Sequence, residues 1–189
     1  MSVPLDPALA RRLARLDASR RRALGVAGSA PHAALNRAPA PGRWSALQVL
    51  HHVVTAEALT LGYIRKKMQA GLALEKAGPA SRLRLLVLQV TLALPLRIKA
   101  PATTGDVPAE SELEALRARW DDVRRDLGGL VESFPPELLD RLVFRHPYAG
   151  RMTLAHALGT LQAHLDHHLP QVERALARRR PLDPEILCS

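Results

Sequence analysis

Cysteine and aromatic residues are scarce in this sequence. The one cysteine, Cys188, lies among the last three of 189 residues, so no disulfide can form within the chain. A single cysteine fits a reducing compartment, and the Met-Ser-Val-Pro start lacks the basic-then-apolar pattern of a secretory signal, so we expect a cytoplasmic protein. Aromatic residues make up only 3% of the chain, which leaves few rings on which single-stranded bases could stack.

Long hydrophobic runs are also absent. The longest, LLVLQVTLALPL at residues 85–96, is interrupted by Gln89 and Pro95 and falls short of the roughly 20 residues that a membrane-spanning helix needs. We therefore expect no membrane partner. At 47% hydrophobic content, 189 residues suffice for one continuous core. We predict a single domain over residues 1–189, with its core from about 6 to 180 and a C-terminal tail at 181–189.

Acidic residues are outnumbered by basic ones. The chain has 18 Asp and Glu against 27 Lys and Arg, a formal net charge of +9. Such an excess marks nucleic-acid binding when the cations gather on one face. Here the arginines alternate with the apolar residues of predicted helices and form a solvated face, in segments 11–15, 19–22, 117–119 and 174–180. We predict no specific nucleic-acid partner and only weak nonspecific attraction to polyanions.

Capping residues mark the start of two helices in the first third of the chain. Asp6 is a good N-cap and is followed by Pro7, which is favoured in the first turn. Ser45 and Gln48 have the spacing of a capping box, and Trp44 just before them is placed to pack onto the first turn. Apolar residues at three-four spacing follow both starts, which predicts amphipathic helices.

Two further helices are predicted in the second half. The segment from Ser111 to Glu114 has the pattern of another capping box, and Thr153 is the expected N-cap of the last helix. No strand-like alternation competes with the helical pattern. A connection from residue 71 to about 110 separates the second and third helices, and its length permits a crossover. The sequence therefore predicts an all-α four-helix bundle with one long crossover between helices 2 and 3.

The last predicted helix carries the stretch AHLDHHLPQV, residues 163–172. His164 and His168 are four residues apart, so they lie on one face, as two imidazoles must to bind one metal ion. His167 points about 100° away. Two ligands make an incomplete site, so a third would come from another helix. The candidates are His32, His51, His52, His146 and His156.

Among these candidates, the adjacent pair His51 and His52 is the most promising. It lies in the first turns of the second helix among apolar residues, where an unpaired polar ring needs an explanation. Both histidines lie at the margins of the apolar stripe, so helical periodicity leaves the choice between them open. The alternative for the whole set is ordinary surface or core histidines, because this spacing also arises by chance.

Two segments resemble the signature regions of a known family. GRWSALQVLHHVVTAEALTLGYIRKK at 42–67 and FRHPYAGRMTLAHALGTLQAHLDHHLPQVERAL at 144–176 are similar to the DinB-like superfamily, and in their histidine pattern to its YfiT-like branch. The resemblance implies a bacterial protein with an up-down-down-up bundle and a divalent metal held by three histidines. Carried over to this chain, these are His52, eight residues after Trp44, together with His164 and His168. His51 and His167 would be outer neighbours.

Three neutral imidazoles would leave coordination positions open, as in catalytic sites, and they suit Zn, Ni or Fe. The resemblance suggests a metal-dependent hydrolase of a small-molecule substrate, with metal-bound water as nucleophile. The alternative is transfer of a low-molecular-weight thiol of the bacillithiol or mycothiol type to an electrophile, with a bound thiolate as nucleophile. A second alternative is a non-catalytic, stress-associated binding bundle. The sequence leaves the substrate, the native metal and a homodimer open.

Several other residues lie near the proposed ligands in sequence. Glu57 lies about 140° around the helix from His52, so we expect a core-edge or salt-bridged acid, with a role as general base as the minor alternative. Pro170 is expected to kink the last helix near the ligands. His146 is expected to order the HPYAG turn, and Tyr148 is a candidate for the pocket rim. Cys188, in the tail, is a poor candidate for an attacking thiol.

Overall fold

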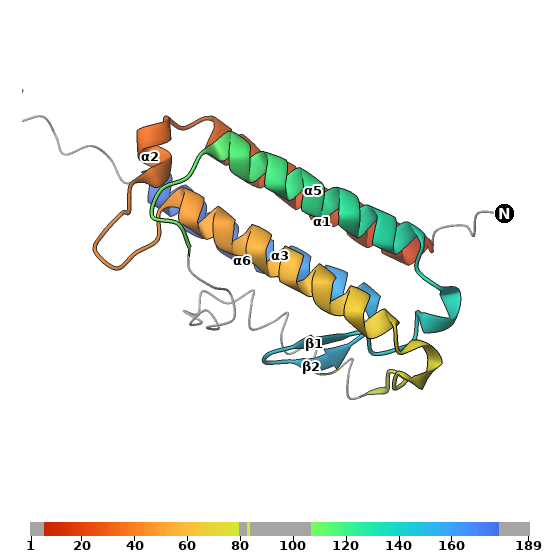
Figure 1. The fold of residues 1–189 in the computed structure, drawn as a ribbon. Helices are drawn as coiled ribbons and strands as arrows, with labels where there is room; N and C mark the ends of the chain where they lie inside the picture. Colours follow the sequence, from red (N-terminus) through yellow and green to blue (C-terminus); the bar gives the residue numbers. More distant parts are fainter. Residues whose placement is uncertain (1–5, 80–82, 84–106, 178–189) are drawn as a thin grey trace, which may run out of the picture.

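The computed structural model describes residues 6–79, 83 and 107–177, and this part of the chain is mostly helical, as predicted (Figure 1). Most of the predicted crossover, the C-terminal tail and Cys188 lie outside the described residues. The long helices are α1 (Pro7–Gly28), α3 (Ala46–Met68), α5 (Leu113–Glu132) and α6 (Leu154–Ala177). The short elements are α2 (His32–Asn36), η1 (Gly71–Ala73), η3 (Pro136–Leu138), β1 (Phe144–His146) and β2 (Gly150–Met152).

The four long helices pack side by side. α1 and α3 each contact both α5 and α6. The Gln48 amide at the start of α3 donates to the carbonyl of Pro108 just before α5, at 3.2 Å, so these two helices begin at the same end. Arg22 near the C-terminal end of α1 pairs with Glu173 near the C-terminal end of α6 at 3.6 Å, so these two helices end at the same side of the molecule. α3 and α5 therefore run in one direction and α1 and α6 in the other, as the colours in Figure 1 show.

The buried side chains form two clusters along these helices. One cluster includes Leu16, Leu127 and Leu158 and reaches the two strands. The other surrounds Trp120, which is fully buried, and includes apolar residues of α3 and of the second half of α6. In the part of the chain that the structure describes, no helix is both long enough and apolar enough to cross a membrane.

Two of the predicted helix starts are confirmed in detail. Asp6 accepts hydrogen bonds from the backbone N–H groups of Ala8 and Leu9, at 2.9 and 3.0 Å. The Ser45 hydroxyl accepts from the backbone of Gln48, whose side chain accepts in return from the backbone of Ser45. These local bonds fix where α1 and α3 begin, and α3 then carries His51 and His52 in its second turn.

The capping box predicted at Ser111 is wrong. α5 begins at Leu113 with Glu112 as its N-cap, and no side-chain cap bond forms. Instead, the backbone N–H of Ser111 donates to the Asn36 side chain at 3.0 Å, and the carbonyl of Ser111 accepts from the same side chain at 3.1 Å. A tertiary contact from α2 has thus taken the place of the local cap.

A small two-stranded sheet was not predicted. β1 and β2 pair antiparallel, with Phe144 opposite Met152, and are joined by the HPYAG turn. Three-residue strands are too short to show a period of two in sequence. The turn is ordered as expected, because His146 Nδ1 accepts from the backbone N–H groups of Tyr148 and Ala149 at 3.2 and 3.3 Å.

Candidate metal centre

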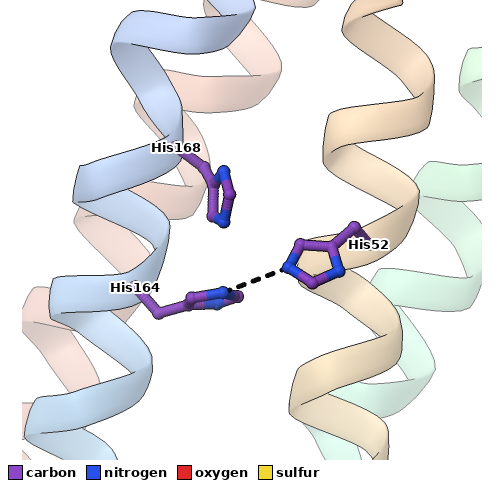
Figure 2. Close-up of side chains that lie close together, drawn as sticks. All are labelled: His52, His164 and His168. Carbon is purple, nitrogen blue, oxygen red and sulfur yellow. Dashed lines mark hydrogen bonds between the residues drawn. The ribbon is translucent and has the colours of Figure 1, made fainter. Parts of the chain in front are cut away.

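Three histidines from two helices converge in the structure. His52 of α3 faces His164 and His168 of α6 (Figure 2). The Nε2 atoms of His52 and His164 are 3.2 Å apart. One ring nitrogen from each of the three residues lies within 4.8 Å of the other two. The structure therefore brings together the three residues that the family resemblance pointed to.

The positions of these rings follow from helix geometry and packing. The four-residue spacing places His164 and His168 one above the other on α6, with ring centroids 4.6 Å apart. α3 runs antiparallel to α6 and presents His52, which is only 3% exposed. Trp44, just before α3, packs against the His52 ring at a centroid distance of 5.2 Å. Predicted only to pack onto the first turn of α3, Trp44 thus also holds a ring of the cluster.

The three imidazoles are neutral at physiological pH. Burial lowers the pKa of His52, and burial together with the neighbouring histidines lowers the pKa of His164 well below its usual value. Burial also lowers the pKa of His168, to about 4. A neutral imidazole offers a lone pair to a metal ion, whereas a protonated one does not. The cluster is therefore in its ligating form at pH 7.

The nitrogens that face away from the cluster differ in their partners. His168 Nδ1 lies 3.0 Å from the side-chain oxygen of Gln171. His52 Nδ1 is buried and has no hydrogen-bond partner in the described part of the chain. Such an orphan nitrogen carries a desolvation cost, which His168 avoids through Gln171. Three neutral imidazoles in this setting could hold a metal ion.

The two outer histidines lie beside the cluster without joining it. His51 faces α5, where the Arg119 guanidinium approaches its ring at 3.4 Å. Burial, and then the charge of Arg119, lowers the pKa of His51. The ring of His167 meets His168 edge-on, with centroids 5.3 Å apart. The structure thus brings His52, and not His51, into the cluster.

The remaining candidates are not part of the cluster. His32 is exposed on α2, 3.4 Å from the carboxylate of Glu112. His146 holds the hairpin turn, and Tyr148 beside it is 63% exposed, with its ring centroid 6.0 Å from that of His146. His156 lies in the first turn of α6, where its backbone N–H donates to the Thr153 hydroxyl. Thr153 thus caps α6 as predicted. The role of Tyr148 at a pocket rim stays a prediction.

Glu57 has the salt-bridged role that its position on the helix suggested. It is 1% exposed, and its carboxylate accepts from Trp120 Nε1 at 2.8 Å and from Arg124 Nε and Nη2 at 2.8 and 2.9 Å. Arg124 also donates to Asp17 of α1 at 3.0 Å. Both oxygens of Glu57 are therefore occupied, and nothing in this arrangement supports a role as general base.

Gln171 is a residue of the site that the sequence analysis missed. It follows His168 by three positions on α6, a spacing at which helical side chains meet. This spacing could have indicated a contact between Gln171 and His168. A glutamine in a helix, however, has no distinctive chemistry until its partner is known. Pro170 lies between the two residues, and α6 continues through it to Ala177. The kink expected at Pro170 stays a prediction.

The lowered pKa values predict how the stability of the metal-free protein depends on pH. An unfolded histidine titrates near pH 6.5, whereas folded His168 titrates near pH 4, so the unfolded state binds more protons between these values. The contribution of His168 to the free energy of unfolding is therefore fully present above pH 6.5 and is lost as the pH falls toward 4. This loss amounts to about 3 kcal/mol from His168 alone. Urea denaturation from pH 8 to 4 measures this loss. A His168→Gln variant should show a shallower fall, and an equal slope in both proteins would contradict the prediction.

The fold and the cluster together define a class of protein: a mostly helical protein with three histidines gathered between two of its long helices. The chain belongs to the DinB superfamily, whose family model matches residues 15–172. The match begins within α1, ends within α6 and includes all three histidines of the cluster. No curated protein and no solved structure shows significant similarity to the chain. The resemblance seen in the sequence is thus confirmed at the level of the superfamily.

Proposed function

We propose that the protein binds a divalent transition metal through His52, His164 and His168 and acts as a metal-dependent hydrolase on a small-molecule substrate. The observation that carries the proposal is the convergence of one nitrogen from each ring, all within 4.8 Å of one another. Three protein ligands are typical of catalytic sites, because tetrahedral structural sites use four. Membership of the DinB superfamily supports a metal-binding role.

The residues of the chain would each make a separate contribution. The three histidines hold the ion, and their neutral state leaves its charge undiminished. Trp44 packs on one face of His52 and limits the movement of that ring. When bound, the metal would supply a lowered pKa for a coordinated water and polarisation of a substrate oxygen. No carboxylate belongs to the cluster among the described residues, so we assign no protein side chain as general base.

The second candidate function is transfer of a low-molecular-weight thiol to an electrophile. The absence of a carboxylate from the described cluster favours it, since an ion held by neutral ligands keeps a positive charge that stabilises a thiolate. The excess of basic residues on the chain would attract the carboxylates of a bacillithiol- or mycothiol-type cosubstrate.

Turnover assays separate these two functions. The metal-loaded protein is expected to hydrolyse ester, amide or phosphoester probes without added thiol, and to lose this activity in His164→Ala. Consumption of an electrophile only in the presence of thiol would instead establish the transferase. A folded, metal-loaded protein that is inactive in both assays would contradict both functions and favour a non-catalytic binding role.

We also infer that the four long helices form the up-down-down-up bundle implied by the YfiT-like resemblance. The shared direction of α3 and α5, and of α1 and α6, supports this order. A parallel pair of consecutive long helices requires a crossover between them, in agreement with the long segment that separates α3 from α5 in sequence. Assignment to the YfiT-like branch, and to a bacterial cytoplasm, belongs to the same proposal.

A further inference from the structure

The far side of the His168 ring makes a specific hydrogen bond. Its Nδ1 atom lies 3.0 Å from Oε1 of Gln171, one turn further along α6. Both side chains are half-buried. Among the described residues, His168 is the one hydrogen-bond partner of the Gln171 side chain. In the described part of the chain, this contact therefore constrains both the glutamine amide and the outer edge of the imidazole.

The chemistry of this contact fixes where the proton of His168 lies. An amide oxygen only accepts hydrogen bonds, so Nδ1 must be the donor. A neutral imidazole has one N–H, and with the proton on Nδ1 the lone pair is on Nε2. Because Nδ1 is hydrogen-bonded to Gln171, Nε2 is the nitrogen of His168 that is available to the cluster with His52 and His164 (Figure 2).

We propose that Gln171 is a positioning residue that holds His168 in its Nδ1–H tautomer and so directs the Nε2 lone pair toward the metal centre. This inference rests on the proposed metal site and deepens it. Metal-bound histidines commonly donate their second N–H to an oxygen, which fixes the tautomer and the ring orientation. His52 Nδ1 has no such partner in the described chain, so the contact with Gln171 distinguishes His168 from His52.

The tautomer can be measured without metal. Long-range ¹H–¹⁵N spectra of the metal-free protein at pH 7.5 are expected to show His168 protonated on Nδ1. In Gln171→Met, which keeps the length of the side chain but removes the acceptor, we expect a shift of the population toward Nε2–H. Gln171→Glu restores an oxygen acceptor and should restore the Nδ1–H form. A wild-type protein with His168 in the Nε2–H form, or a Gln171→Met variant with an unchanged tautomer, would overturn the inference.

Metal affinity provides the second readout. We expect Gln171→Met to bind Zn²⁺ about 10- to 100-fold more weakly than wild type in competition with a chromophoric chelator, and Gln171→Glu to recover most of this loss. Gln162→Met is the matched control, since Gln162 lies on the same helix and contacts Asp166 instead. Equal affinity of Gln171→Met and wild type would count against the role of Gln171.

The two experiments separate failure of the inference from failure of the proposed function. If the wild type takes up no Zn²⁺, the metal-binding proposal fails, while the spectra of the metal-free protein still decide whether Gln171 sets the tautomer. If the wild type binds Zn²⁺ and Gln171→Met leaves both tautomer and affinity unchanged, the metal site stands and the role of Gln171 is rejected.

Discussion

Substitution of His52, His164 or His168 by alanine is expected to reduce the metal content of the purified protein from near-stoichiometric to a small fraction of that amount. Each substitution leaves two imidazoles, and two ligands hold a divalent ion far more weakly than three. Changes at residues that only support a ligand already cost about 10- to 100-fold in affinity, so loss of a ligand itself should cost more than about 100-fold. Elemental analysis of untagged protein, purified without chelators, measures the result for wild type and all three variants.

His51 provides the matched control for this series, because it neighbours His52 on α3 but faces Arg119 instead of the cluster. His51→Ala should keep its metal, and His167→Ala should do so as well. If a ligand variant retained wild-type metal content, the assignment of that residue would be wrong. A wild-type protein that is folded, metal-free and unable to take up added Zn, Ni or Fe would remove the enzyme interpretation and leave a non-catalytic binding bundle.

The sequence alone was sufficient to predict that the two histidines of the cluster on α6 lie together. The spacing of His164 and His168 places both on one face wherever the helix is formed. The partner on α3 was harder to identify, because His51 and His52 both lie at the margins of the apolar stripe. Their difference arises from tertiary packing: α5 approaches His51 through Arg119, and α6 approaches His52. The family resemblance supplied the choice that helical periodicity left open.

Other features depended on contacts that no local pattern encodes. Ser111 has the sequence of a capping residue, but Asn36, 75 positions earlier, binds both its backbone N–H and its carbonyl. Local propensity was overridden by this long-range contact. The helix starts at Asp6 and Ser45 were predictable because their hydrogen bonds close within three residues. The predicted helix starts thus held where the capping bond is local and failed where a partner distant in sequence replaces it.

The second large effect is expected at the buried ion pair between Glu57 and Arg124. Replacing Arg124 with Met should lower the free energy of unfolding by about 3 to 5 kcal/mol, because the Glu57 carboxylate would remain buried with the Trp120 N–H as its one remaining hydrogen-bond donor among the described residues. Burial already raises the pKa of Glu57, and the charge of Arg124 opposes that rise. Urea denaturation at pH 7 measures the loss.

Arg125 supplies the comparison that separates burial from charge. It neighbours Arg124 on α5 and pairs with Asp122 at 2.8 Å, but both side chains of that pair are exposed. Arg125→Met should therefore cost less than about 1 kcal/mol. Removing both buried charges in Glu57→Leu/Arg124→Met should recover much of the stability lost in Arg124→Met, since no buried charge is left unpaired and Asp17, which also loses Arg124, is 39% exposed to solvent. If the double variant were no more stable than Arg124→Met, the buried carboxylate would not be the source of the loss, and the contacts of Arg124 with Trp120 and Asp17 would be the remaining causes.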